Sequence, residues 1–184
     1  GPRCYGPWEA EGASGGLLAF QEDIVESLES EDRRGGLAVM AMGLGARNIV
    51  QELVRIHSKE TKIVFVLNVT ENELDTINRE LKRQGSNCHL QAITSDISVS
   101  DRQKLFLAGG CFSVTNRIAI VDLLNDLIPV DLISGLIIDK AHRVRDNSTE
   151  AFIIRVYKSK SKGFIKAISD DPKRFVHGFS KLEK

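Results

Sequence analysis

The chain has 184 residues, of which 42% are hydrophobic and 27% are charged, and these values fit one well-packed soluble domain. Its 25 basic residues balance 25 acidic ones, which excludes a strongly basic nucleic-acid-binding surface, so any DNA contact has to come from a local patch. No apolar stretch reaches the length of a membrane span and there is no signal peptide, so no membrane partner is expected.

The sequence pattern changes near both ends of the chain. Residues 1–16 are rich in glycine and lack hydrophobic periodicity, which predicts a disordered leader or the remnant of a tag. Residues 17–176 carry regular patterns and are expected to form the folded unit. Residues 177–184 are interpreted as the start of a following segment, so we expect the chain to be a piece of a longer protein.

Helical and extended patterns alternate along the folded unit. Apolar residues with helical spacing, and helix caps such as Thr70 with its capping-box partner Glu73, predict helices at about residues 17–28, 46–58, 71–84, 98–108, 118–127 and 148–158. Short apolar runs between them predict strands at residues 37–42, 63–67, 89–93, 111–115, 136–139 and 163–169. This alternation predicts an α/β fold, a mostly parallel sheet flanked by helices, in which ligands bind at the carboxyl ends of the strands.

The first candidate site is a glycine loop between the first strand and the second helix. Gly43 and Gly45 have the setting of a P-loop, whose backbone N–H groups hold phosphates. A working P-loop continues with Lys and then Ser or Thr, whereas Ala46 and Arg47 stand at these positions. The loop therefore predicts a degenerate nucleotide site, and a plain tight turn is the other interpretation.

The second candidate site follows the fifth strand. Asp139-Lys140-Ala141-His142 reads like a helicase Asp-Glu-Ala-His box with Lys140 in place of the glutamate that polarises the attacking water. Asp139 is the residue type that holds Mg²⁺, but a lysine is not a base at neutral pH unless its pKa falls far. The alternative is an ordinary strand end in which Lys140 pairs with Asp139, and His142 is expected to pack or hydrogen-bond rather than to bind a metal.

The cysteines give no sign of a metal site. Cys4, Cys88 and Cys111 are odd in number and have no metal-ligand spacing, so free thiols in a reducing compartment are expected.

The longest motif carries a family resemblance. Residues 115–129 run directly into residues 131–143, followed by residues 149–155 and 163–170. Together with the two damaged motifs, this pattern resembles the N-terminal helicase-like region of the XPF family of DNA repair endonucleases over residues 17–175.

The resemblance implies a fold and a function. It implies the first RecA-like lobe of a degenerate superfamily 2 helicase, without ATP hydrolysis and without ATP or Mg²⁺ as cofactors. Members of the family are nuclear, structure-specific endonucleases of nucleotide excision and interstrand crosslink repair, and they pair with a nuclease-dead relative through C-terminal regions. Their metal-dependent Gly-Asp-x-x-Glu-Arg-Lys motif does not occur in this chain, so we expect no enzyme activity from the fragment itself.

The same resemblance indicates where DNA would contact the lobe. The loops after the second and fourth strands of active relatives contact the DNA backbone, and the matching residues are Asn68, Thr70, Thr115 and Arg117. Hydroxyls and an arginine suit phosphate contacts, which position DNA without reading its sequence. The other interpretation is that Asn68, Thr70 and Thr115 only cap helices.

Two further segments have weaker signals. Lys158, Lys160 and Lys162 form a small basic patch that could contact phosphates or simply face solvent. Residues 169–171 lie at the position of the helicase coupling motif and are expected to have a structural role.

Three functional hypotheses remain open at this point. The favoured one is an inactive lobe that helps to place a nuclease on branched or single-stranded DNA and contacts the second lobe and the nuclease domain. A protein-interaction scaffold without DNA contact is the alternative. An active DNA-dependent ATPase would need Arg47 to replace the P-loop lysine and His142 to replace the base.

Overall fold

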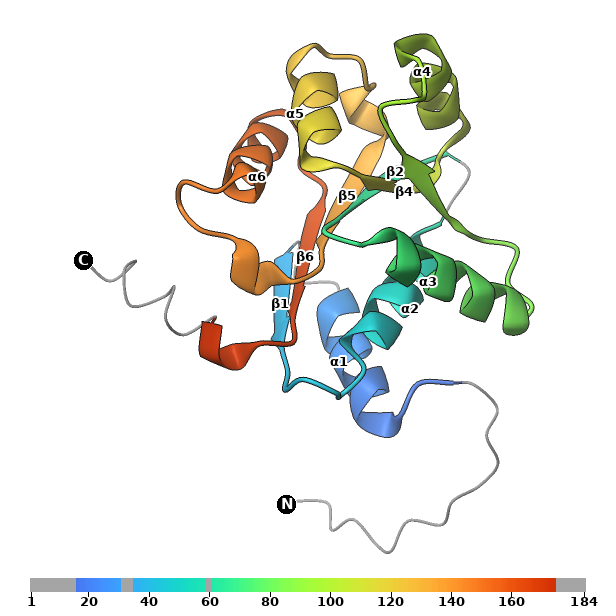
Figure 1. Ribbon diagram of the computed structural model, residues 1–184, viewed down its shortest axis with the longest axis vertical. Helices are drawn as coiled ribbons and strands as arrows, with labels where there is room; N and C mark the ends of the chain where they lie inside the picture. Colours follow the sequence, from blue (N-terminus) through green and yellow to red (C-terminus); the bar gives the residue numbers. More distant parts are fainter. Residues whose placement is uncertain (1–15, 31–34, 59–60, 175–184) are drawn as a thin grey trace, which may run out of the picture.

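A computed structural model describes residues 16–30, 35–58 and 61–174 (Figure 1). Its helices are α1 (Ala19–Glu29), α2 (Ala46–His57), α3 (Glu71–Arg83), α4 (Val99–Ala108), α5 (Asn116–Leu124) and α6 (Thr149–Lys160). Its strands are β1 (Gly35–Val39), β2 (Ile63–Leu67), β3 (Leu90–Ile93), β4 (Gly110–Val114), β5 (Ile133–Ile138) and β6 (Phe164–Ser169). Short 3₁₀ turns occur at Val130–Leu132 and Ala141–Arg143. The expected leader before residue 16 and the expected following segment, 177–184, lie outside the described residues.

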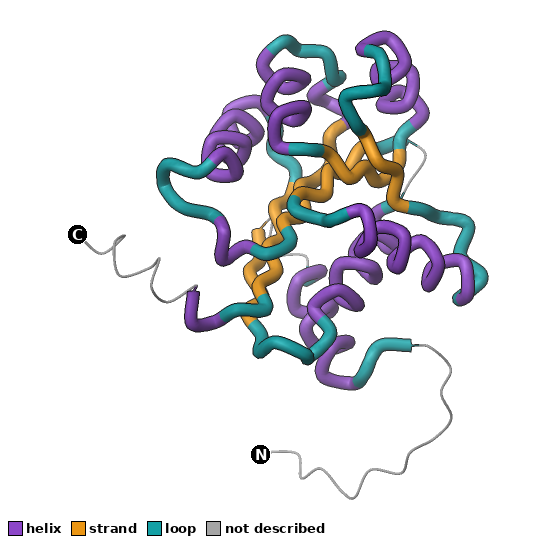
Figure 2. The backbone as a smooth tube through the Cα atoms, in the orientation of Figure 1, coloured by secondary structure: helices purple, strands orange, loops and turns teal. Residues whose placement is uncertain are grey.

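The six strands form one parallel sheet in the order β1-β6-β5-β2-β4-β3. Helices cover both faces of this sheet, as Figure 2 shows. The predicted α/β fold with a parallel sheet is therefore confirmed.

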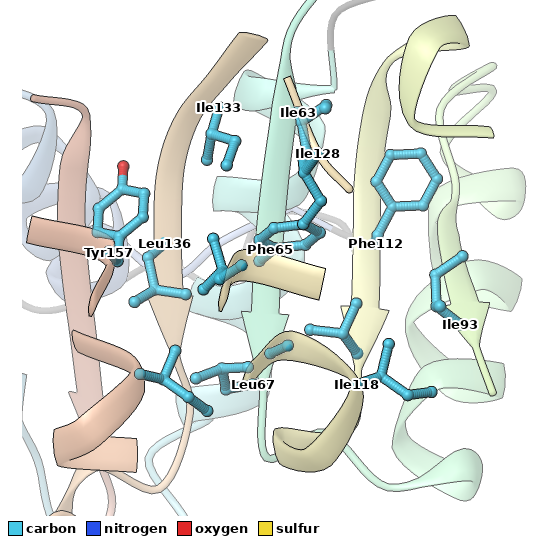
Figure 3. Close-up of a cluster of buried hydrophobic side chains, with 14 of the residues drawn as sticks. Ile63, Phe65, Leu67, Ile93, Phe112, Ile118, Ile128, Ile133, Leu136 and Tyr157 are labelled. Atoms are coloured by element: carbon cyan, nitrogen blue, oxygen red, sulfur yellow. The ribbon is translucent and has the colours of Figure 1, made fainter. Parts of the chain in front are cut away.

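The core consists of two apolar layers, one on each side of the sheet. Val64 and Val66 of β2 pack with α1, α2 and α3. The alternate residues Phe65 and Leu67 pack with α4, α5 and α6, where their side chains gather on one side of the strands (Figure 3). Every residue of β2 is buried, as its uninterrupted apolar run predicts.

The position of β1 differs from the prediction. Gly35 and Gly36 belong to the strand rather than interrupting the chain before it, and the strand ends at Val39 instead of residue 42. A Cβ atom on Gly36 would lie 2.6 Å from Cδ2 of Leu28, so the glycine leaves room for this side chain of α1 on the strand.

The strand β5 begins at Ile133, three residues earlier than predicted, and it again contains a glycine, Gly135. A Cβ atom on Gly135 would overlap the ring of Phe164 in β6, so the missing side chain makes room for an aromatic ring. A glycine inside a strand is easily read as a break, and for this reason the sequence alone places both strand starts too late.

A buried ion pair joins α4 and α5, two of the helices on the same face of the sheet. Arg102 of α4 donates two hydrogen bonds to Asp122 of α5, at 2.9 and 2.7 Å, and a third to the carbonyl of Ile97. Both side chains are almost fully buried, and the two-pronged geometry satisfies both carboxylate oxygens.

In the part of the chain that the structure describes, no helix is long and apolar enough to cross a membrane.

Candidate functional site at the carboxyl ends of the strands

Most of the candidate site residues lie at the carboxyl ends of the strands. Because the strands are parallel, the loops after β1, β2, β4, β5 and β6 all leave the sheet at the carboxyl ends of the strands. The glycine loop follows β1 and the Asp139–His142 segment follows β5, with β6 between these two strands. The glycine loop and the Asp139–His142 segment therefore both lie at the carboxyl ends of the strands, where α/β sheets bind ligands.

The glycine loop keeps the backbone geometry that its glycines permit. Gly43 and Gly45 have φ angles of 86° and 80°, in the left-handed region that favours glycine. Gly45 is the N-terminal cap residue of α2 and provides no side-chain cap. The loop thus retains a tight turn into an uncapped helix N-terminus, while Ala46 brings neither charge nor hydroxyl.

Gln21 of α1 is a contact of this loop that the sequence interpretation missed. Its side chain is 1% exposed, and its Nε2 donates a hydrogen bond of 2.9 Å to the carbonyl of Leu44. Its Oε1 accepts a hydrogen bond of 3.0 Å from the backbone N–H of Leu18. Gln21 therefore fastens the glycine loop to α1, and a polar residue beside an apolar helical stripe gave no signal of this role.

Arg47 does not take the place of a P-loop lysine. It is exposed and lines a broad groove of about 1090 Å³ between α1, α2 and α3, together with Glu80 and Arg83. The hydrogen bond from Arg83 lowers the pKa of Glu80, and the charge of Arg47 contributes further. The groove is lined by residues of these helices and of the adjoining loops and by no residue of a strand, so its volume does not make it the nucleotide site.

Lys140 is the centre of a compact charge cluster. Its ammonium group lies 2.8 and 2.7 Å from the two carboxylate oxygens of Glu73, 3.3 Å from Oδ2 of Asp139 and 3.0 Å from the carbonyl oxygen of Asn68. The predicted pair with Asp139 is present, but Glu73 at the start of α3 is the closer partner. The cation thus joins the loop after β5 to the loop after β2.

Two residues of the cluster have left-handed backbone conformations. Asn68 and Lys140 have φ angles of 67° and 51°, and they follow neighbouring strands. The Asn68 side chain donates to the carbonyl of Asp139 at 3.0 Å, and Asp139 Oδ1 accepts from the backbone N–H of Lys140 at 2.8 Å. Such strain is tolerated where surrounding contacts fix it, and it concentrates at functional sites.

The pKa values of the two acidic residues in the cluster are shifted in opposite directions. Burial raises the pKa of Asp139 above its usual value, although the neighbouring Lys140 opposes this shift. Partial burial would also raise the pKa of Glu73, but hydrogen bonds from Lys140 and Thr70 lower it below its usual value. At neutral pH the cluster therefore holds Glu73 as a carboxylate paired with an ammonium group.

His142 has the packing role that the sequence favoured. It is buried, its Nδ1 lies 3.1 Å from the hydroxyl of Ser169, and it is 3.8 Å from Asp170. The segment at the coupling-motif position thus contacts the Asp139–His142 segment directly. Within the described ranges, no three His, Cys, Asp or Glu side chains come together in a way that could hold a metal ion.

The four predicted DNA contacts occupy different environments. Thr70 and Thr115 cap α3 and α5 through their side-chain oxygens, and Thr70 forms the predicted capping box with Glu73. The side-chain amide of Asn68 donates a hydrogen bond to the carbonyl of Asp139. Arg117 is exposed and forms no ion pair with any residue that the structure describes.

A small hollow joins two of these positions. It measures about 260 Å³ and lies between the ends of β2, β3 and β4, lined by Asn68, Thr94, Ser113, Thr115 and Asn116, among others. Its hydroxyl and amide groups suit contacts with phosphate oxygens, whereas the rest of its lining consists of the carboxylate of Glu71 and apolar side chains.

Comparison with known proteins identifies what this arrangement is related to. No protein-family model matches the chain. The chain is 36% identical over 169 residues to "DNA repair endonuclease XPF" of Cricetulus griseus, a match that covers 91% of this chain and 18% of that protein. It is 34% identical over 166 residues to "DNA repair protein rad16" of Schizosaccharomyces pombe, covering 90% and 19%.

This chain is homologous to one segment of the XPF-type DNA repair endonucleases. The segment spans less than a fifth of the length of these curated relatives. The predicted resemblance to this family is therefore confirmed, over about nine-tenths of the chain.

The XPF-type segment also has the fold that was predicted for it. The helicase domain of Pyrococcus furiosus Hef superimposes with a TM-score of 0.67 at 21% identity, covering 89% of this chain and 36% of the Hef chain. At this identity the likeness concerns the fold alone, and it confirms a helicase-like RecA lobe.

Two thiols are described in the XPF-type segment, and both are free. Cys88 is half-buried beside the hydroxyl of Ser86, whereas Cys111 is buried in β4. Burial raises the pKa of Cys111 to about 12. Cys4 lies outside the described residues.

Proposed function

We propose that this chain is a catalytically inactive, helicase-like lobe that helps to place the nuclease of an XPF-type endonuclease on branched DNA. The parent protein would act in nucleotide excision repair and interstrand crosslink repair in the nucleus. One observation supports the absence of ATP hydrolysis: the ammonium group of Lys140 is bound to Glu73 and Asp139.

The contacts of Asp139 support the absence of a Mg²⁺ site. Its Oδ1 accepts the backbone N–H of Lys140 at 2.8 Å, and its Oδ2 faces the ammonium group at 3.3 Å. A divalent cation at this carboxylate would have to approach a fixed positive charge and displace these contacts. We therefore infer that the chain uses neither ATP nor Mg²⁺.

The glycine loop supports the same proposal. A phosphate in the loop would find the backbone N–H groups of α2 but no lysine and no metal-binding hydroxyl. Arg47 lies on the outer groove with Glu80, and His142 is bound to Ser169. No described contact favours an active ATPase that relies on these two residues.

The proposed DNA contact centres on α5 rather than on α3. The first turn of α3 contains Glu71 and Glu73, which disfavour an anion at its N-terminus, whereas the first turn of α5 contains no acidic residue. Arg117 lies in that turn, next to the hollow at Thr115. We propose that a DNA phosphate binds at the N-terminus of α5, beside Thr115 and Arg117, rather than in the part of the hollow that Glu71 lines, and that Asn68 and Thr70 mainly maintain the shape of the neighbouring loop.

The remaining partners are also proposals. The second helicase-like lobe, the metal-dependent nuclease domain and a nuclease-dead heterodimer partner would contribute the cleavage that this segment does not perform. The zero net charge of the chain favours one competing function, a protein-interaction scaffold without DNA contact.

A titration with fork-shaped DNA at low and at physiological salt tests the proposal. We expect salt-sensitive binding, and Arg117→Ala should weaken it and reduce the salt slope by about one. Arg79→Ala, which removes an exposed charge from α3, is the matched control and should leave binding unchanged. An absence of binding at low salt would favour the scaffold.

A further inference from the structure

The two outermost strands of the sheet, β3 and β1, differ in whether their outer backbone groups are hydrogen-bonded. On the β3 edge, the side-chain amide of Asn78 donates to the carbonyl of Leu90 at 2.9 Å and accepts from its N–H at 2.7 Å. This side chain occupies backbone groups that would otherwise be free to pair with another strand. On the outer edge of β1, no comparable contact is made by any residue that the structure describes.

The pairing of β1 shows which backbone groups are free. Met40 donates its N–H to the carbonyl of Ser169 at 2.9 Å, so this residue faces β6. Because the backbone groups of a strand alternate in direction, those of Leu37 and Val39 point away from β6. Leu37 and Val39 are 47% and 43% exposed, which agrees with an open edge (Figure 1).

A groove lies beside this open edge. It has a volume of about 640 Å³ and is lined by the first residues of β1, the end of α6 and the start of β6. Leu37, Ile154 and Ile165 give it an apolar floor, while Lys158 and Lys162 stand at its rim. The groove opens near the amino ends of β1 and β6, so it is separate from the site at the carboxyl ends.

The two rim lysines differ from the lysine between them. Lys160 donates to the carbonyl of Leu123 at 2.7 Å and pairs with Asp126. Within residues 16–30, 35–58 and 61–174, neither Lys158 nor Lys162 forms an ion pair. Two unpaired positive charges thus border an apolar groove.

We propose that the outer edge of β1 and this groove bind an extended, acidic segment of a partner protein as an additional strand. The free N–H and C=O groups of Leu37 and Val39 would pair with the segment's backbone. Alternate side chains of the segment would point into the groove, with apolar groups against Leu37 and Ile154 and carboxylates against Lys158 and Lys162.

The shape and chemistry favour a peptide over a nucleic acid. A DNA backbone would use the two lysines but would leave the apolar floor and the strand's hydrogen-bonding groups unmatched. An exposed strand edge is a template for pairing, and proteins usually block such edges, as Asn78 does at β3. The exposed apolar residues of β1 therefore indicate a protein partner.

A binding assay with a defined probe tests the charge requirement. The probe is a short fluorescein-labelled peptide of alternating valine and glutamate, and the control peptide alternates valine and lysine. We expect the acidic peptide alone to bind, and the double variant Lys158→Glu/Lys162→Glu should weaken it by roughly tenfold or more. Lys82→Glu on the opposite face of the sheet is the charge-matched control and should have no effect.

Hydrogen exchange measured by NMR tests the strand pairing itself. In the free protein the amides of Leu37 and Val39 should exchange faster than those of Ala38 and Met40, which face β6. Bound peptide should slow exchange at Leu37 and Val39. Leu37→Pro removes one outward N–H but no bond to β6, so it should weaken the peptide while the melting temperature stays close to that of the wild type.

A probe with N-methylated amides separates loss of pairing from loss of folding. Methylation of every second peptide nitrogen on the face toward β1 should abolish binding to the unmodified protein. Undiminished binding of that probe, or equal binding of both peptides, would overturn the proposal. It would also be overturned if fork-shaped DNA displaced the probe and lost its own affinity in the double lysine variant, because the groove would then be a DNA site.

Discussion

The ammonium group of Lys140 lies 2.7 Å and 2.8 Å from the carboxylate oxygens of Glu73, a residue 67 positions earlier in the chain. Lys140 stands where an active helicase has a glutamate, and Glu73 belongs to the capping box of α3. Lys140 therefore joins the loop after β5 to the start of α3. The cluster therefore fixes the loops after β2 and β5 relative to each other.

Replacing Lys140 should destabilise the lobe. In Lys140→Gln, Glu73 and the half-buried Asp139 lose their shared cation, and we expect a loss of about 1.5–3 kcal/mol in the free energy of unfolding. Urea denaturation measures this loss, and Lys82→Gln on the surface of α3 is the control. A change in Lys140→Gln no larger than in the control would mean that the cluster contributes nothing to stability.

Restoring the glutamate should make stability depend on pH in a defined direction. In Lys140→Glu three carboxylates meet, so repulsion should raise the pKa of Glu73 above its unfolded value and raise further the pKa of Asp139, which burial already raises in the wild type. The native state then binds more protons than the unfolded state, and stability falls as the pH rises through the raised pKa values. Urea midpoints measured at several pH values between about 5 and 8 test this against the wild type.

The wild type should behave differently at low pH because of Glu73. Its pKa is lowered in the folded state, so its contribution is complete above the unfolded value and is lost as the pH falls through the folded value. If Lys140→Glu became more stable with rising pH between about 5 and 8, the repulsion argument would be wrong.

The two loop glycines should differ in their tolerance of alanine. Gly43 has no atom within 4 Å of a Cβ position, so Gly43→Ala should cost only the backbone strain, about 1–2 kcal/mol. In Gly45→Ala the new Cβ would also collide with Nε2 of Gln21, which adds the loss of the Gln21–Leu44 hydrogen bond, about 1 kcal/mol. Thermal denaturation of both variants compares the costs.

A double variant isolates the role of Gln21. Because Gly45→Ala already displaces the glutamine, Gln21→Ala should cost less in the Gly45→Ala background than in the wild type. Strictly additive costs would show that Gln21 does not hold the loop.

The two described thiols should react at different rates. Burial raises the pKa of Cys111 to about 12, so its thiolate is scarce at neutral pH and reagents cannot reach it in the folded state. In a Cys4→Ser background, we expect one fast thiol, Cys88, in the native protein and two after unfolding. Rapid labelling of Cys111 in the native protein, detected by peptide mass, would contradict this packing.

The fold was predictable where burial dominates the sequence pattern. The run Ile63–Leu67 is buried on both faces and could be recognised as a strand from its residues alone. The starts of β1 and β5 were not predictable, because Gly36 and Gly135 serve contacts with Leu28 and Phe164 from other parts of the chain. Local pattern carries no information about such close approaches.

The candidate site was predictable only in part, for a similar reason. The sequence contains the pair Asp139–Lys140 directly, and this pair is present at 3.3 Å. Glu73 was recognised only as a helix cap, and its contact with Lys140 depends on the neighbouring positions of β2 and β5. Gln21 lies on a helix that precedes the loop, and its buried side chain could be found only in three dimensions.

Steady-state ATP hydrolysis by this chain, measured with and without single-stranded DNA, decides whether the lobe is catalytically inactive. We expect a rate at background level that is the same for the wild type and for Asp139→Ala, because the carboxylate already binds Lys140. A rate above background that single-stranded DNA stimulates and Asp139→Ala abolishes would show that the lobe is an ATPase.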